Sequence, residues 1–143
     1  MDKKRRPIVS VDLIVTRGNE ILLGRVGDKW AGKRKYEWGL PGREIDFKDS
    51  FKDTIKKNLK KDTGLVLKNF RVFCVNNNFG FGNHYIAIGI LVKANGEPIV
   101  MEPEDWKEWA WFPKNSIPRK LFPSAQLTIE CFVKNKVSVK SYG

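Results

Sequence analysis

The sequence has no long hydrophobic segment. No apolar run approaches the roughly 18 residues that a membrane-spanning helix needs, and residues 1–6 are mostly basic rather than apolar like a signal peptide. Linkers rich in Pro, Gly or Ser are also missing, so no domain boundary is indicated. We therefore expect a soluble, cytoplasmic protein with no membrane partner. A basic arm at residues 1–6 and a C-terminal tail at 137–143 flank a single domain at 7–136.

Cysteine and histidine are scarce. Cys74 and Cys131 are too few and too far apart in the sequence for a disulfide framework or a zinc site, so we expect both to be small core residues. The single histidine, His84, is expected to be a hydrogen-bonded strand residue rather than a catalyst.

Acidic residues are fewer than basic residues. The 27 Lys and Arg against 16 Asp and Glu give a net charge of +11. This excess favours an anionic partner such as a nucleotide or nucleic acid, although a solvated lysine-rich surface explains it equally well.

Hydrophobic periodicity predicts an α+β fold with a mixed sheet, because strands, a helix, further strands and a last helix follow one another. The predicted strands are residues 8–15, 20–26, 70–75, 84–92 and 106–112, and the predicted helices are 49–63 and 123–132. The first strand alternates with a period of two and is expected to be half-buried. The third and fourth strands are expected to pair antiparallel, and residues 27–39 to form a loop.

The helix at 49–63 carries an anomaly. Ser50 and Asp53 predict a capping box, and Gly64 stands where a helix C-terminus favours glycine. On a helical wheel Asn58 and Asp62 fall within the apolar stripe, whereas most lysines fall on the solvent side. A core-facing aspartate needs a partner. For Asp62 this is either a backbone N–H or an arginine such as Arg25, or a hard cation such as Mg²⁺.

The motif Leu40-Pro41-Gly42, followed by a loop and a helix that ends in Gly64-Leu65, resembles the Nudix hydrolase family. The family's box reads G-x5-E-x7-R-E-U-x-E-E-x-G-U, where U is aliphatic, and it aligns with residues 43–65. The resemblance covers nearly the whole chain in its order of elements. It implies the Nudix fold, an α/β/α sandwich around a mixed β-sheet, for the domain at 7–136.

The chemistry of the box is degenerate. Leu59, Gly64 and Leu65 agree with the pattern, whereas the other positions hold Arg43 for glycine, Lys57 for arginine, and Asp49, Asn58, Lys61 and Asp62 for the glutamates. In the family the helix glutamates hold Mg²⁺, which bridges the diphosphate and polarises it for attack by water. A protonated lysine cannot bind a metal ion. The resemblance therefore implies a weakened Mg²⁺ site with Asp62 as its principal ligand and Asn58 as a weaker, neutral one.

One branch of the family, the GDP-mannose mannosyl hydrolases, also lacks the two upstream glutamates and adds a ligand from the loop before the final strand. Here that loop is residues 102–105, so Asp105 or Glu104 would be the added ligand. The branch's histidine base would fall near Trp106, so its mechanism does not transfer directly. Glu44, Glu102 or Glu104 would act as the base if burial raised its pKa.

The second half is similar to the MutT-type nucleotide diphosphatases, with His84-Tyr85 opening a strand and Glu102-Pro103-Glu104 before an aromatic strand. The resemblance implies hydrolysis of a nucleoside diphosphate-linked compound, either a nucleotide or a nucleotide sugar. The candidate substrate residues are Arg25, Arg43, Lys57 and Lys61 for phosphate and Trp38, Phe79 and Phe81 for stacking on a base. Lys57 would alternatively hold the preceding loop, as the family's arginine does.

The alternative is a non-catalytic Nudix-fold protein. Without Mg²⁺, Lys57, Lys61 and the basic segment 29–35 would hold phosphate in a basic cleft, and the partner would be a nucleotide, RNA or a ribonucleoprotein. Nudix proteins are often dimers, so a homodimer also stays open.

Overall fold

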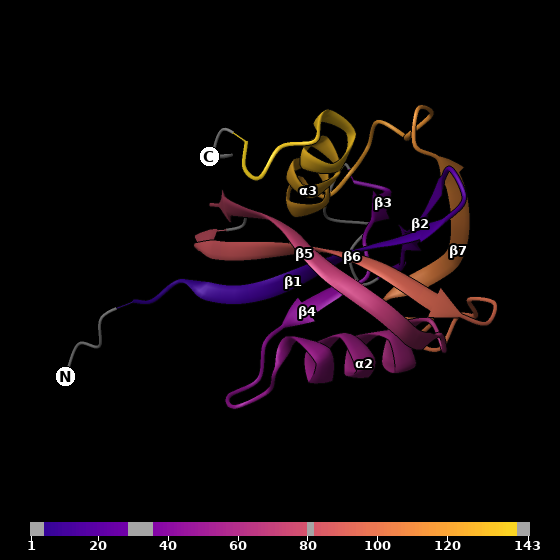
Figure 1. The fold of residues 1–143 in the computed structure, drawn as a ribbon, viewed down its shortest axis with the longest axis horizontal. Coiled ribbons are helices and arrows are strands. Elements are labelled where there is room, and N and C mark those ends of the chain that lie inside the picture. Colours follow the sequence, from indigo (N-terminus) through magenta and orange to yellow (C-terminus); the bar gives the residue numbers. More distant parts are fainter. Residues whose placement is uncertain (1–4, 29–35, 80–81, 140–143) are drawn as a thin grey trace.

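The computed structural model describes residues 5–28, 36–79 and 82–139, which form one mixed sheet covered by two helices (Figure 1). The elements are β1 Ile8–Arg17, β2 Glu20–Val26, β3 Trp38–Gly39, β4 Gly42–Glu44, α2 Phe51–Asp62, β5 Val66–Asn78, β6 Tyr85–Asn95, β7 Trp106–Pro113 and α3 Pro123–Lys134. The sheet order is β3-β2-β1-β6-β5, with β4 also pairing with β1 and β7 with β2.

The sheet is mixed because β1 and β6 are parallel, whereas the other strand pairs are antiparallel. Helices α2 and α3 cover opposite faces of it (Figure 1). The predicted α/β/α sandwich is therefore confirmed. Neither helix of the described residues is long and apolar enough to cross a membrane.

Strand β1 lies inside the sheet and contributes side chains to two hydrophobic cores. Val11, Leu13 and Val15 pack with Ile55 and Leu59 of α2. Ile14 belongs to a second core with residues of α3. The expectation of a half-buried strand is therefore wrong, because α3 covers the face that alternation assigned to solvent, and Asp12 on that face is only 9% exposed.

Helix α2 forms as its sequence predicts. The Ser50 side chain accepts from the Asp53 backbone N–H, and the Asp53 side chain accepts from the Ser50 N–H, which completes the capping box. Gly64 follows the helix with a φ of +73°, a conformation that costs glycine least. Asn58 and Asp62 are both buried, as the helical wheel predicts.

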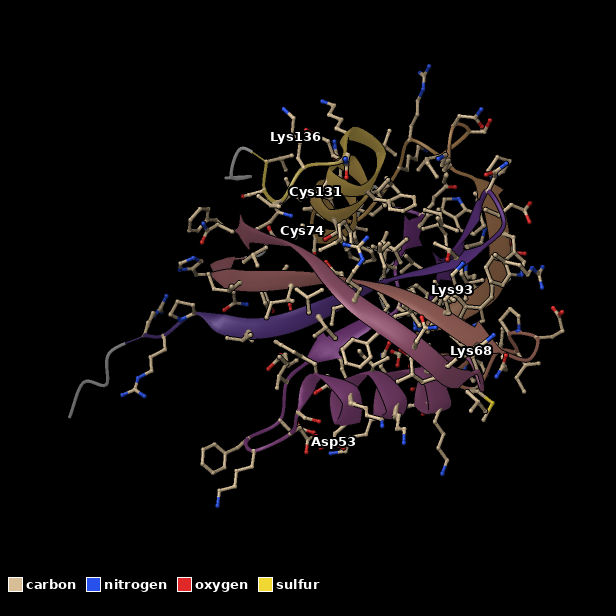
Figure 2. All side chains as sticks on the ribbon, in the orientation of Figure 1. Asp53, Lys68, Cys74, Lys93, Cys131 and Lys136 are labelled. Carbon is tan, nitrogen blue, oxygen red and sulfur yellow. The ribbon has the colours of Figure 1, made fainter. Side chains whose placement is uncertain are left out.

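Two elements are absent from the sequence prediction. β4 spans three residues, and β3 spans two within the segment expected to be a loop. Elements this short carry no measurable periodicity. Strands β5 and β6 are longer than predicted but pair antiparallel as expected. Cys74 of β5 and Cys131 of α3 are buried, as expected, where this helix packs on the sheet (Figure 2).

Candidate functional site

A cavity of about 630 Å³ opens among β1, β4, α2, the segment before β7 and the start of α3. It is lined by Ser10, Asp12, Val26, Gly39, Leu40, Gly42, Arg43, Glu44, Asp46, Asn58, Lys61, Asp62, Asn78, Tyr85, Asp105, Trp106, Phe122, Pro123, Ser124 and Ala125. All three candidate metal ligands, Asp62, Asn58 and Asp105, are among them. So are the candidate base Glu44 and the candidate phosphate residues Arg43 and Lys61.

Asn58 and Asp62 form the buried polar pair of the cavity wall. Asn58 Nδ2 donates to Asp62 Oδ2 at 2.9 Å and to the Gly42 carbonyl at 3.1 Å. The two flanking acceptors fix the orientation of the amide. Asn58 Oδ1 is buried and finds no hydrogen-bond donor among the described residues. An unpaired buried polar atom is costly, and a carbonyl oxygen is a ligand that suits Mg²⁺.

Asp62 is held by neighbours on its own side of the cavity. Its partner is Asn58 rather than Arg25 or a backbone N–H, and its own backbone carbonyl accepts from Trp109 Nε1 at 3.0 Å. Burial raises the pKa of the Asp62 carboxyl, while the hydrogen bond from Asn58 and the positive charge of Lys61 act in the opposite direction. The negative charge of Asp105 also raises this pKa, which places the two carboxylates within electrostatic reach of each other.

This donor set suits a cation that the substrate helps to hold. In the part of the chain that the structure describes, no cluster of three or more His, Cys, Asp or Glu side chains forms a complete metal site. Mg²⁺ is usually held by one or two carboxylates together with waters and substrate phosphates. That minimum is met by Asp62, Asp105 and the unpaired Asn58 Oδ1. The positive charge of Lys61 acts against the binding of a cation here.

The two candidate bases differ in position. Glu44 lies on β4 and lines the cavity, whereas Glu104 is not among the lining residues. Both side chains are exposed, so the burial expected to tune the base is absent from these two positions. The third candidate, Glu102, is half-buried but does not line the cavity.

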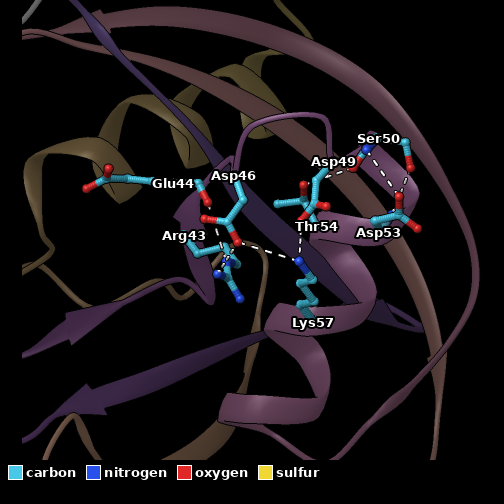
Figure 3. A network of polar contacts seen from close by, with 8 residues as sticks. All are labelled: Arg43, Glu44, Asp46, Asp49, Ser50, Asp53, Thr54 and Lys57. Atoms are coloured by element: carbon cyan, nitrogen blue, oxygen red, sulfur yellow. Dashed lines mark hydrogen bonds and ion pairs between the residues drawn. The ribbon is translucent and has the colours of Figure 1, made fainter.

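Lys57 belongs to a network that holds the loop between β4 and α2 (Figure 3). Its Nζ pairs with Asp49, and with Asp46 Oδ2 at 3.5 Å. Arg43 Nη2 donates to the same Asp46 carboxylate at 3.0 Å. The pKa of the Lys57 ammonium group is raised, chiefly by its hydrogen bond to Asp49. Lys57 thus ties α2 to the loop from outside the cavity lining, which agrees with a scaffold role.

The remaining candidates lie apart from the cavity lining. Arg25 pairs with Glu108 at 3.3 Å, and its guanidinium lies 5.4 Å from the centre of the Trp38 ring. Trp38 itself is 9% exposed and packs edge-on against Phe112 in the core.

Phe79 is exposed and lies against His84, with the ring centres 4.6 Å apart. His84 Nε2 is 2.9 Å from Asn77 Oδ1, so His84 is hydrogen-bonded as expected. Phe81 and the basic segment 29–35 lie outside the described residues.

Sequence reasoning missed the residues at the α3 side of the cavity. Asp12 Oδ2 accepts hydrogen bonds from the Ser124 and Thr128 hydroxyls, the latter at 3.1 Å. Burial raises the pKa of Asp12. Tyr85 and Asn78 also line the cavity. A polar residue on the second face of a central strand is the only signal that marks Asp12 in the sequence.

The described lining of the cavity is more acidic than basic. Among the described residues that line it, five are acidic, namely Asp12, Glu44, Asp46, Asp62 and Asp105, and two are basic, namely Arg43 and Lys61. The positive charge of the chain therefore lies mainly elsewhere. This lining favours a site that binds a metal cation over a site that binds phosphate through several Lys and Arg side chains.

Comparison with known proteins gives the family. A family model described as the NUDIX domain matches residues 6–131. A MutT Nudix hydrolase from Burkholderia pseudomallei is 26% identical with a TM-score of 0.77, over 88% of this chain and 98% of that one.

Two structures of lower identity share the fold. A MutT protein from Methanosarcina mazei Go1 is 18% identical with a TM-score of 0.75, over 94% of this chain and 98% of that one. A UDP-X diphosphatase is 18% identical with a TM-score of 0.71, over 92% of this chain and 63% of that one. The match of the family model over most of the sequence, on a sheet and two helices of the same arrangement, shows that this chain belongs to the Nudix hydrolase family.

Proposed function

We propose that this chain hydrolyses a nucleoside diphosphate-linked compound, a nucleotide or a nucleotide sugar, at a reduced Mg²⁺ site in the cavity beside α2. The observation that carries the proposal is the buried pair of Asn58 and Asp62. Both residues line the cavity, and the buried Asn58 Oδ1 is left without a donor among the described residues. A protein rarely buries an unpaired amide oxygen at a cavity wall unless something else supplies its partner.

The residues that would hold the ion are Asp62, Asp105 and Asn58. Bound there, Mg²⁺ would supply the Lewis acid that polarises a diphosphate for attack by water. Asp62 is the principal ligand because it combines burial with a carboxylate. In the structure Asp62 Oδ2 accepts from Asn58 Nδ2, so a bound cation would compete with this hydrogen bond.

The other cavity residues bind and orient the substrate. Arg43 and Lys61 place positive charge beside the diphosphate, and Arg43 is held in place by Asp46. Glu44 is the favoured base because it lines the cavity and Glu104 does not. Lys57 positions the loop that follows Arg43 and Glu44 of β4 rather than touching the substrate.

The printed names of similar structures support the substrate class. One of them is a UDP-X diphosphatase, whose substrate is a nucleoside diphosphate-linked compound. The base and the sugar stay open.

A non-catalytic protein that binds a nucleotide or RNA is the second candidate. The observation that favours it is Lys61, which lines the cavity where the family has an acidic metal ligand. The excess of acidic residues among the described cavity lining weighs against polyanion binding at this site.

A hydrolysis assay in ¹⁸O-labelled water tests the proposal. The purified protein is incubated with MgCl₂ and a panel of nucleoside triphosphates, nucleotide sugars and single-stranded RNA, and the products are followed by ³¹P NMR. We expect turnover that Asp62→Asn abolishes. Asp53→Asn, a matched change on the same helix outside the cavity lining, should retain it. Tight RNA binding without turnover of any compound would instead establish the non-catalytic candidate.

A further inference from the structure

Asp12 is a buried carboxyl group that the reaction proposed above does not use. It lies on the α3 face of β1, lines the cavity and is 9% exposed. Its Oδ2 accepts from two hydroxyls of α3, Ser124 and Thr128. Among the described residues no Lys, Arg or His side chain pairs with it.

The two hydroxyls determine which oxygen of Asp12 is available. Both donate to Oδ2, so neither donates to Oδ1. Oδ1 lies beside Gly42, where an added Cβ would come within 2.9 Å of it. The missing side chain at Gly42 therefore leaves room beside Oδ1, and both residues line the cavity.

The surroundings of Asp12 favour its neutral form. A buried carboxyl without a cationic partner is costly to ionise, and burial, the largest influence, raises the pKa of Asp12, whereas the hydrogen bonds from Ser124 and Thr128 act in the opposite direction. Cys74 of β5 lies within electrostatic reach, but its own pKa is raised to about 12, so the thiol is uncharged. The other titratable groups that line the cavity with Asp12 are Tyr85 on β6, Arg43 and Glu44 on β4, Asp46 after β4, Lys61 and Asp62 on α2, and Asp105 before β7. With Oδ2 accepting two hydrogen bonds, the proton belongs on Oδ1.

We propose that Asp12 is a ligand-binding residue that donates its Oδ1 proton to an acceptor oxygen of the compound bound in the cavity. The acceptor is an oxygen of the diphosphate or one of the attached nucleoside or sugar. The inference rests on the proposed function for the class of ligand. It explains why a carboxyl lines a site for polyanions, since a neutral acid attracts an anionic oxygen that a carboxylate would repel.

Asp12→Asn is the diagnostic variant. The amide oxygen takes over the two hydroxyl contacts of Ser124 and Thr128, so the amide NH₂ is presented to the cavity in place of the acid proton. The variant thus keeps a donor at every pH. Asp12→Ala removes the donor altogether. Glu130→Gln is the matched control, because Glu130 lies on α3 outside the cavity lining and pairs with Lys134.

Calorimetric titration with UDP-glucose and with inorganic pyrophosphate, over a range of pH, tests the inference. We expect Asp12→Asn and Glu130→Gln to bind like the unaltered chain at acidic pH, and Asp12→Ala to lose about 10- to 100-fold in affinity, as for one hydrogen bond to a charged group. Affinity of the unaltered chain should fall as pH rises through the raised pKa of Asp12, while that of Asp12→Asn stays level. If Asp12→Ala loses affinity for both ligands, the acceptor oxygen lies on the diphosphate. If it loses affinity for UDP-glucose alone, the acceptor oxygen lies on the nucleoside or the sugar.

Two results would overturn the inference while leaving the proposed function intact. One is equal binding by the unaltered chain and Asp12→Ala. The other is an affinity of Asp12→Asn as low as that of Asp12→Ala, which would mean that the carboxylate accepts rather than donates. If Asp12→Ala does not fold, the pH profile of Asp12→Asn decides the question. If the unaltered chain binds neither ligand and hydrolyses no compound of the panel above, the proposed function fails and this inference fails with it.

Discussion

Replacing Asn58 by aspartate should convert a pair held together by one hydrogen bond into a pair that requires a cation. The amide nitrogen, 2.9 Å from Asp62 Oδ2 and 3.1 Å from the Gly42 carbonyl, becomes an oxygen. Two carboxylates at 2.9 Å repel by about 6 kcal/mol at an effective dielectric constant of about 20. One of them will take up a proton instead, so we expect the free energy of unfolding of the metal-free variant to fall by about 1–3 kcal/mol.

Mg²⁺ should restore this loss. A ligand at about 100 times its Kd stabilises the folded state by about 2.7 kcal/mol. For a chain of this size that corresponds to a rise in Tm of about 5–10 °C. The unaltered chain should gain much less, because the Asn58 amide already occupies Asp62 Oδ2 and Lys61 opposes a cation.

Calorimetric unfolding in EDTA and in saturating MgCl₂ measures the effect, with NaCl at equal ionic strength as the control for screening. The double variant Asn58→Asp/Asp62→Asn should lose the response to Mg²⁺. A variant Asn58→Asp that is destabilised and gains nothing from Mg²⁺ would refute the reasoning, because the two positions would then not share a cation.

Three further predictions follow from the same residues. Lys61→Glu should raise Mg²⁺ affinity by about tenfold or more, since it removes an opposing charge and adds a carboxylate; unchanged affinity in a calorimetric titration would argue against this geometry. The raised pKa of Asp12 means that the folded state binds this proton more tightly, so its contribution to stability is full below the unfolded pKa and declines as pH rises through the folded pKa. Asp12→Asn should therefore flatten the fall of Tm with pH, and a steeper fall would contradict the assignment. Lys57→Ala should speed amide hydrogen exchange in residues 43–50 with little change in Tm, and unchanged exchange would remove Lys57 from its scaffold role.

Helix α2 could be predicted from the sequence because the features that determine it are local. The Ser50–Asp53 capping box and the burial of Asn58 and Asp62 depend on residues within two or three turns of one another. The wheel also showed that Asp62 must have a partner. It did not show that Asn58 supplies it, because the alternatives differ by rotations of a few side chains that periodicity does not describe.

The rest of the site depends on long-range contacts. Asp12 looked like a solvent-facing residue of an alternating strand, and only α3, which returns 112 residues later to contact it through Ser124, buries it. Arg25 and Lys57 looked equivalent to Arg43 and Lys61 as phosphate partners. In the structure Arg25 and Lys57 are not among the cavity lining and pair with acidic side chains, whereas Arg43 and Lys61 line the cavity.

The net charge of +11 suggested a basic cleft, yet the described lining of the cavity holds more acidic than basic residues. A net charge is a sum over the whole surface and carries no information about position. It therefore cannot distinguish a polyanion site from a carboxylate site that uses a metal ion.

The dependence of turnover on Mg²⁺ concentration tests the central claim most directly. Initial rates of hydrolysis of a nucleotide sugar and a nucleoside triphosphate would be measured against MgCl₂ for the unaltered chain and for Asp62→Asn, which retains the shape of the side chain. A reduced metal site predicts saturable Mg²⁺-dependent turnover with weak metal affinity, and its loss in the variant. Turnover that is independent of Mg²⁺, or that survives in Asp62→Asn, would contradict the account.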